Sequence, residues 1–144
     1  NNSSFFSVKN DMLFYTLVQL LYLLILYNFF GIFTLFIAVL VAVISFLLLE
    51  TINYIEHYGL LRKKINGRYE KVQTIHSWNS NHFVGRIVLY ELTRHSDHHY
   101  RTSKKYQILE NKKESPQLPF GYPTSMLISM IPPLWYRLMN PRLV

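Results

Sequence analysis

A run of 38 residues, from Met12 to Leu49, carries no charged side chain. One helix needs only about 20 apolar residues to cross a hydrocarbon core of about 30 Å. The run is therefore long enough for two crossings, and the segment Asn28-Phe29-Phe30-Gly31 near its middle offers a turn. We predict two helices, about Met12–Phe29 and about Ile32–Leu49. Two buried core helices of a soluble protein are the alternative, but a 17.2 kDa chain has little surface with which to cover them.

Positive charge is concentrated outside this run. Of the 15 Lys and Arg residues, 14 follow residue 50, and the net charge is +7. A basic chain can bind nucleic acid, but the apolar run favours a membrane and no nucleic acid. Basic segments stay on the cytoplasmic side of a membrane. We therefore predict an N-terminal flank (1–11), two transmembrane helices in the cell inner membrane (12–49) and a cytoplasmic region (50–144).

A cluster of histidines lies in residues 94–99, which read RHSDHH. On a helix, His95, His98 and His99 are three or four residues apart, so their imidazoles can converge on one side. The chain has no cysteine, so a metal would be held by His, Asp or Glu. Neutral imidazole binds iron, zinc and copper well. The alternative is an exposed, histidine-rich helix end or a pH-sensitive patch.

A stripe of polar residues follows the apolar run. Glu50, Asn53, Tyr54 and His57 share one helical face, which predicts that the second helix continues past Leu49. A solvated amphipathic face explains the same spacing equally well.

Three carboxylates are candidates for supporting ligand histidines, because a carboxylate that accepts the second ring N–H of a histidine fixes its orientation. These are Glu56, Glu91 and Asp97, and Glu91 lies one helical turn before His95. Each of them is, alternatively, an ordinary surface charge.

The apolar segment 118–135 is interrupted by four prolines, so it is predicted to form a cap rather than a membrane span. The sequence thus predicts an all-α integral membrane protein, with a multi-pass transmembrane helical hairpin and a cytoplasmic helical cap that carries the histidine ligands.

The residues after position 50 resemble a known family in several ordered segments. Residues 53–60 (NYIEHYGL) are similar to the signature of bacterial alkane 1-monooxygenases, and residues 94–99 are similar to the last histidine box of that family. Further similar segments are GRYE (67–70), HSWNSN (76–81), PQLP (116–119) with GY (121–122), PPLW (132–135) and PR (141–142). The resemblance identifies a membrane-bound, non-haem di-iron enzyme of the fatty acid desaturase and hydroxylase superfamily.

The resemblance implies an oxidoreductase that uses O2 to hydroxylate the terminal methyl group of linear alkanes. Electrons would come from rubredoxin and its reductase. The metal ligands would be His57, His95, His98 and His99, and the cofactor two irons. Two earlier histidine boxes of the family are absent, so the chain resembles the C-terminal part of the enzyme, and alone it is expected to be inactive.

Several assignments stay open at this stage. Leu92, three residues before His95, is either near the reacting end of the substrate or a packing residue. His76 and His82 are read as structural or surface histidines. The basic run 101–105 would attract either an acidic electron donor or anionic lipid headgroups. Rival functions are a fatty acid desaturase or hydroxylase, an aryl-methyl monooxygenase, and a non-catalytic membrane protein that binds metal.

Overall fold

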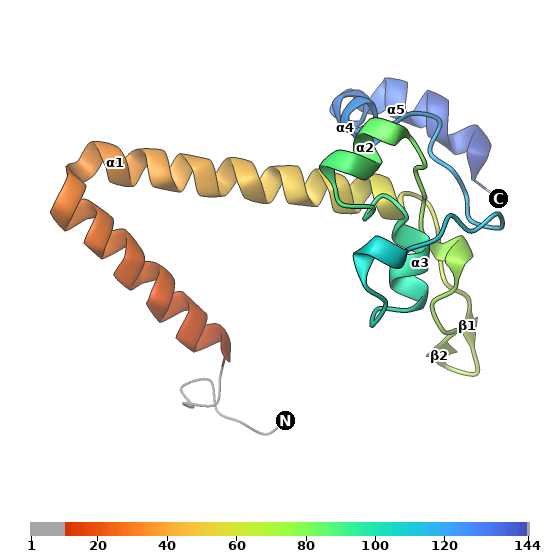
Figure 1. Cartoon of the computed structure of the whole chain (residues 1–144), viewed down its shortest axis with the longest axis horizontal. Helices are drawn as coiled ribbons and strands as arrows, with labels where there is room; N and C mark the ends of the chain where they lie inside the picture. The colour runs from red at the N-terminus through yellow and green to blue at the C-terminus, as the bar shows by residue number, and fades with distance from the viewer. Residues whose placement is uncertain (1–10, 144) are drawn as a thin grey trace. The chain divides into compact units, whose positions relative to one another are not determined.

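A computed structural model of the chain describes residues 11–143 (Figure 1). The predicted N-terminal flank thus lies, apart from Asp11, outside the described residues. The chain divides into two compact units, residues 1–47 and 48–144, which are described separately.

The first unit contains most of helix α1 (Asp11–His57), which has a break in the middle. Gly31 has φ 80° and ψ 179°, a conformation almost restricted to glycine, and helical arms flank it on both sides. The Asn28 Nδ2 donates to the Leu24 carbonyl (2.7 Å) and the Thr34 Oγ1 to the Phe30 carbonyl (3.1 Å), so polar side chains beside the break bind within the helix.

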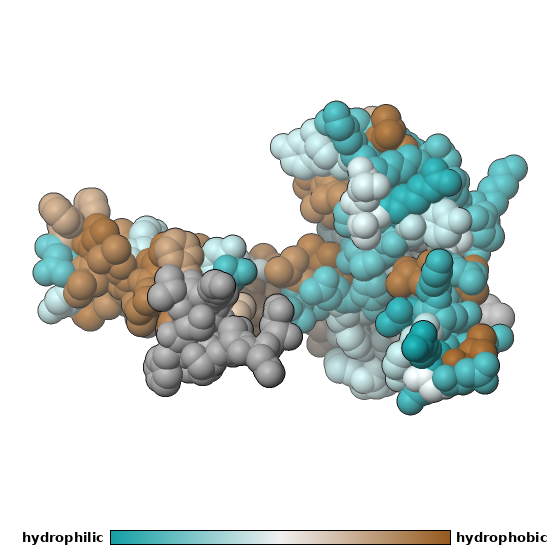
Figure 2. Space-filling view, turned by 90° about the horizontal axis from the view of Figure 1, so that it is seen from below, coloured by the Kyte–Doolittle hydropathy of each residue, from teal (hydrophilic) through white to brown (hydrophobic). Residues whose placement is uncertain are grey.

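The visible surface of α1 in the first unit is mostly apolar (Figure 2). Among residues 11–143, α1 is the one helix that is long and apolar enough to cross a membrane. The break at Gly31 falls where the sequence predicts a turn. The arrangement of the two arms as a hairpin across a bilayer stays a prediction.

The second unit begins with the last turns of α1, which remain helical through the polar stripe to His57, as predicted. Short elements follow: strands β1 (Lys64–Ile65) and β2 (Arg68–Tyr69), helices α2 (Phe83–Val88), α3 (His95–Tyr100), α4 (Tyr122–Ser129) and α5 (Pro132–Met139), and 3-10 helices η1 (Thr74–His76), η2 (Tyr106–Ile108) and η3 (Asn140–Arg142).

The described residues are mostly helical, as predicted, but residues 64–69 form a short β-hairpin that was not predicted. Strands β1 and β2 pair antiparallel, with Lys64 opposite Tyr69. The turn between them is Asn66-Gly67, and both residues have positive φ (50° and 79°). Asn-Gly is the favoured pair for such a two-residue hairpin turn, which explains why this short segment is not helical.

The core of the second unit joins the end of α1 to the C-terminal segment. Ile55, Trp78, Leu118, Tyr122, Trp135 and Met139 form one buried cluster. The Trp78 Nε1 donates to the Tyr58 carbonyl (2.8 Å). Helices α4 and α5 both have proline in their first turn, where its missing N–H costs nothing. The proline-interrupted segment is therefore packed into the core beside the histidine-bearing elements.

Candidate metal centre

Three histidines from two distant segments meet in the second unit. His57 is the last residue of α1, and His95 and His99 lie one turn apart on α3. One ring nitrogen of each lies within 4.8 Å of the others. The two Nε2 atoms of His57 and His95 are 3.1 Å apart. The ring centroids of His95 and His99 are separated by 4.3 Å. Three converging imidazoles form a donor set suited to a divalent transition metal.

Backbone turns on both sides explain this convergence. Helix α1 ends at His57, and Gly59, two residues later, has φ +70°. The start of α3 is held by Asn79, whose Oδ1 accepts hydrogen bonds from the Ser96 backbone N–H (3.0 Å) and the Ser96 hydroxyl (2.9 Å). The Ser80 backbone N–H donates to the Thr93 carbonyl (2.8 Å). The segment 77–80 therefore joins the end of α1 to the start of α3.

His98 lies outside the group of three. Its ring centroid is 6.1 Å from that of His95 and 5.7 Å from that of His99. Consecutive residues of a helix are about 100° apart, so His98 and His99 point in different directions. The structure brings together three of the four histidines predicted as ligands, and a ligand role for His98 stays a prediction.

Glu56 contacts the group directly. Its Oε2 lies 3.2 Å from the His95 Nε2, and its Oε1 accepts a hydrogen bond from the Tyr122 hydroxyl (2.8 Å). The predicted contact was with the second nitrogen of a ligand ring, whereas this contact is on the same nitrogen that faces His57. Glu56 is therefore on the side of His95 where the three imidazoles meet.

Burial keeps both partners of this contact neutral. Burial raises the pKa of Glu56 to about 7, against an opposing effect of the Tyr122 hydrogen bond. Burial, and then the neighbouring His99, His57 and His98, lowers the pKa of His95 to about 2. The same burial effect lowers the pKa of His99 and raises that of Tyr122. Below pH 7 the contact is thus a hydrogen bond between neutral groups, and His95 is in the unprotonated form that binds metal. A metal bound at the His95 Nε2 would replace this hydrogen bond.

Glu91 and Leu92 occupy positions that the helical prediction did not anticipate. Helix α3 begins at His95, and Glu91 has φ +62°, so neither residue lies on a helical face shared with His95. Both Glu91 oxygens bind Arg86 (2.8 Å each), and Oε2 also lies 3.3 Å from the Arg94 Nε. Leu92 is 42% exposed. The prediction that both residues share a helical face with His95 is therefore wrong. The supporting role of Glu91 and the substrate contact of Leu92 stay predictions that no longer have this geometric support.

Asp97 is buried beside α3, where its Oδ2 accepts hydrogen bonds from the Lys104 Nζ (2.7 Å) and the Glu110 backbone N–H (2.8 Å). These bonds lower its pKa although burial opposes them. The carboxylate therefore holds the loop that follows α3.

The two remaining histidines differ in their surroundings. The buried His76 accepts a hydrogen bond from the Gln73 backbone N–H at its Nδ1 (3.0 Å), and its Nε2 lies 3.2 Å from Glu70. Its contacts fit the structural role predicted for it. His82 is exposed at the start of α2.

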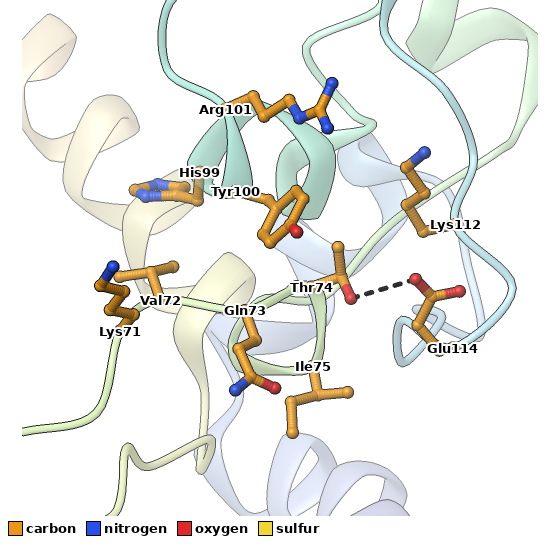
Figure 3. A pocket seen from close by; sticks show the side chains of 10 residues that line it. All are labelled: Lys71, Val72, Gln73, Thr74, Ile75, His99, Tyr100, Arg101, Lys112 and Glu114. Atoms are coloured by element: carbon orange, nitrogen blue, oxygen red, sulfur yellow. Dashed lines mark hydrogen bonds between the residues drawn. The ribbon is translucent and has the colours of Figure 1, made fainter.

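Two open pockets border the histidine group. One, of about 850 Å³, is lined by His99 together with Lys71, Arg101, Lys112 and Glu114, and the Thr74 hydroxyl donates to Glu114 (3.3 Å) (Figure 3). The other, of about 420 Å³, is lined by both His57 and His99. His99 thus lines a pocket with a basic rim, and the histidine group is accessible from outside.

Two contributors to the site were not predicted from the sequence. Tyr122 reaches Glu56 across 66 positions of the chain, and Asn79 reaches Ser96 across 17. Both lie in segments of family resemblance (GY and HSWNSN), and that resemblance was the one available signal for them.

The chain belongs to the fatty acid desaturase family, whose sequence profile matches residues 2–129. Membership of this family and the clustered imidazoles together imply that the chain binds metal.

Within this family the chain is similar to the alkane 1-monooxygenases. It is 54% identical over 97 residues to alkane 1-monooxygenase 2 of Alcanivorax borkumensis, covering 67% of this chain and 25% of that protein. It is 50% identical over 96 residues to alkane 1-monooxygenase of Acinetobacter baylyi (66% and 24%). A more distant relative, the xylene/toluene monooxygenase hydroxylase component XylM of Pseudomonas putida, is 33% identical over 97 residues (67% and 25%). The chain spans about a quarter of the length of these relatives.

Proposed function

We propose that the chain is a segment of a membrane-bound alkane 1-monooxygenase, which hydroxylates the terminal methyl group of linear alkanes with O2. The observation that carries the proposal is the meeting of His57, His95 and His99. The identity of about half with alkane 1-monooxygenases, against 33% with the xylene/toluene enzyme, supports the alkane rather than the aryl-methyl substrate.

Iron is the proposed metal, bound by His57, His95 and His99, with His98 as a ligand to a second ion. Iron would supply the activation of O2. The neutral state of His95 and His99 supports this assignment because an imidazole binds metal only in its unprotonated form. Three imidazoles leave open positions on one iron, so the remaining ligands would come from other segments of the whole protein. The chain alone would then bind iron weakly and lack activity.

The two arms of α1 are proposed to cross the inner membrane as a hairpin with Gly31 at its tip. Each arm has about 20 residues, which at 1.5 Å per residue matches a hydrocarbon core of about 30 Å. The basic residues after position 50 support a cytoplasmic position for that region, by the positive-inside rule.

Within the first unit, an apolar pocket of about 480 Å³ lies between the arms, lined by residues that include Leu23, Ala38, Val39 and Ala42. An alkane offers no polar group, so a pocket of this apolar character suits it.

The basic rim beside His99 is the proposed side of approach for the electron donor, a rubredoxin. Lys71, Arg101 and Lys112 line this pocket (Figure 3). Opposite charges steer a small acidic protein toward such a surface and speed its association at low salt. The position of these cations next to a proposed ligand suits electron transfer to the metal.

The test uses the whole enzyme that contains this segment. Iron content, alkane-dependent NADH oxidation with rubredoxin and its reductase, and products from octane, xylene and an acyl thioester are measured. We expect bound iron and 1-octanol, and loss of both in His57→Ala and His99→Ala, whereas the exposed His82→Ala keeps them. Reversible metal exchange without O2 consumption would instead indicate a metal-binding protein, and a preference for xylene or the thioester would refute the alkane assignment.

A further inference from the structure

We infer that Tyr122 is a positioning residue of the metal centre and acts through the Glu56 carboxylate, which it holds toward the place where the three imidazoles meet. The inference rests on the proposed function insofar as His95 is a metal ligand. Tyr122 opens α4, and its side chain is 1% exposed. Its hydroxyl donates to the Glu56 Oε1 at 2.8 Å, while the Glu56 Oε2 lies 3.2 Å from the His95 Nε2. The three side chains thus form a continuous line from the C-terminal segment to the histidine group.

The tyrosine determines which way the carboxylate faces. Glu56 is 4% exposed, and a buried carboxyl group needs a partner for each oxygen. Because the phenol hydroxyl occupies Oε1, the other oxygen is held toward His95. Without the hydroxyl, the carboxyl group is free to rotate about its last bond, and the contact with His95 loosens. Outer partners that hold the groups around a metal in place change metal affinity by about 10–100-fold when they are removed.

The ring of Tyr122 is itself held firmly. It belongs to the buried cluster with Ile55, Trp78, Leu118 and Trp135. Gly121 precedes it, and a Cβ at that position would lie 3.5 Å from the His82 Cβ, so the backbone there is closely packed. The hydroxyl therefore has one position relative to Glu56, and the rest of the ring does not depend on it. Removing the oxygen alone separates positioning from packing.

The experiment compares Tyr122→Phe with Tyr58→Phe in the whole enzyme loaded with Fe²⁺. Tyr58 is a matched control because its hydroxyl also donates to a side chain, the Asn140 Oδ1 at 2.6 Å, but this bond does not lead to a histidine. Release of Fe²⁺ to a chelator is timed, the visible spectrum of the Co²⁺-loaded protein is recorded, and thermal unfolding of the metal-free protein is measured. We expect Tyr122→Phe to release iron about 10–100-fold faster and to alter the Co²⁺ spectrum. Tyr58→Phe is expected to match the parent protein in both.

A second comparison tests the route through Glu56. In a Glu56→Ala background, Tyr122→Phe is expected to have no further effect on iron release, because the group through which it acts is gone. Equal iron release by Tyr122→Phe and Tyr58→Phe would overturn the inference, as would an equally large effect of Tyr122→Phe with and without Glu56. Faster release explained wholly by a loss of metal-free stability would also overturn it. A parent enzyme that binds no iron would refute the proposed function instead, so the two failures are distinguishable.

Discussion

Asn79→Ala is expected to destabilise the second unit and to disturb the start of α3. Asn79 is 0% exposed, and its Oδ1 is the acceptor for both the backbone N–H and the hydroxyl of Ser96. The first N–H groups of a helix have no partner within the helix, so Asn79 supplies one from a distant segment. Alanine leaves the buried Ser96 N–H without an acceptor, whereas the Ser96 hydroxyl keeps its contact with Ser115 (2.7 Å).

The expected loss of unfolding free energy in Asn79→Ala follows from these contacts. An orphaned buried donor costs about 1–3 kcal/mol, and each further lost hydrogen bond costs about 1 kcal/mol. The Asn79 Nδ2 also donates to Asn111 (3.3 Å), so the total loss of unfolding free energy is about 2–4 kcal/mol. Denaturant unfolding of the metal-free enzyme, followed by tryptophan fluorescence, measures it. Trp78, the residue before Asn79, reports on this region.

Asn81→Ala is the matched control for this prediction. It makes the same chemical change two residues away, where an exposed side chain accepts a single long contact from Arg94 (3.4 Å). Surface changes of this kind alter stability by less than about 0.5 kcal/mol. If Asn79→Ala and Asn81→Ala unfold at the same denaturant concentration, Asn79 does not hold α3 and the reasoning is refuted.

Two further predictions concern Glu56 and Gly59. Because the folded pKa of Glu56 is raised from 4.5 to about 7, its contribution to stability is full below pH 4.5 and is lost as pH rises through 7. Metal-free Glu56→Gln is thus expected to gain about 3 kcal/mol on the parent protein between pH 4.5 and pH 8 in denaturant unfolding, and a constant difference would contradict this. Gly59→Ala places a Cβ against Leu143 at φ +70° and is expected to cost at least about 1–2 kcal/mol and to lower iron content. Gly67→Ala is the control, because Gly67 also has a positive φ but an added Cβ there would meet no atom within 4 Å. Equal iron content in Gly59→Ala and Gly67→Ala would contradict an effect on His57.

The apolar run and the continuation of α1 were predictable because both depend on local sequence. Periodic polar residues at 50–57 predict a helix wherever its neighbours allow one, and α1 does extend to His57. The strands at 64–69 were missed although Asn66-Gly67 is a hairpin signal, because each strand has two residues, fewer than the runs of about 4–8 residues that indicate a strand. The turn conformation, with positive φ at both residues, outweighs the weak strand pattern.

The histidine group was predictable in part, for a related reason. His95 and His99 lie on one helix, so their separation follows from helical geometry, and their proximity is a local property. Glu91 was misplaced because its positive φ is not helical, so α3 does not extend back to it, and helical spacing does not predict this. The contacts of Tyr122 with Glu56 and of Asn79 with Ser96 join distant segments, and no spacing in the sequence specifies them.

The buried core of the second unit, rather than either helix alone, sets the position of His57 relative to α3. Ile55 and Glu56 are the two buried residues of α1, and they precede His57 directly. Ile55 belongs to the same buried cluster as the C-terminal residues Trp135 and Met139. The Trp78 backbone N–H donates to the Glu56 carbonyl (2.8 Å), which joins the segment holding α3 to the same turn of helix. A segment rich in proline and without a histidine thus packs against the turn of α1 that precedes His57, so changes there should act on metal binding without touching a ligand.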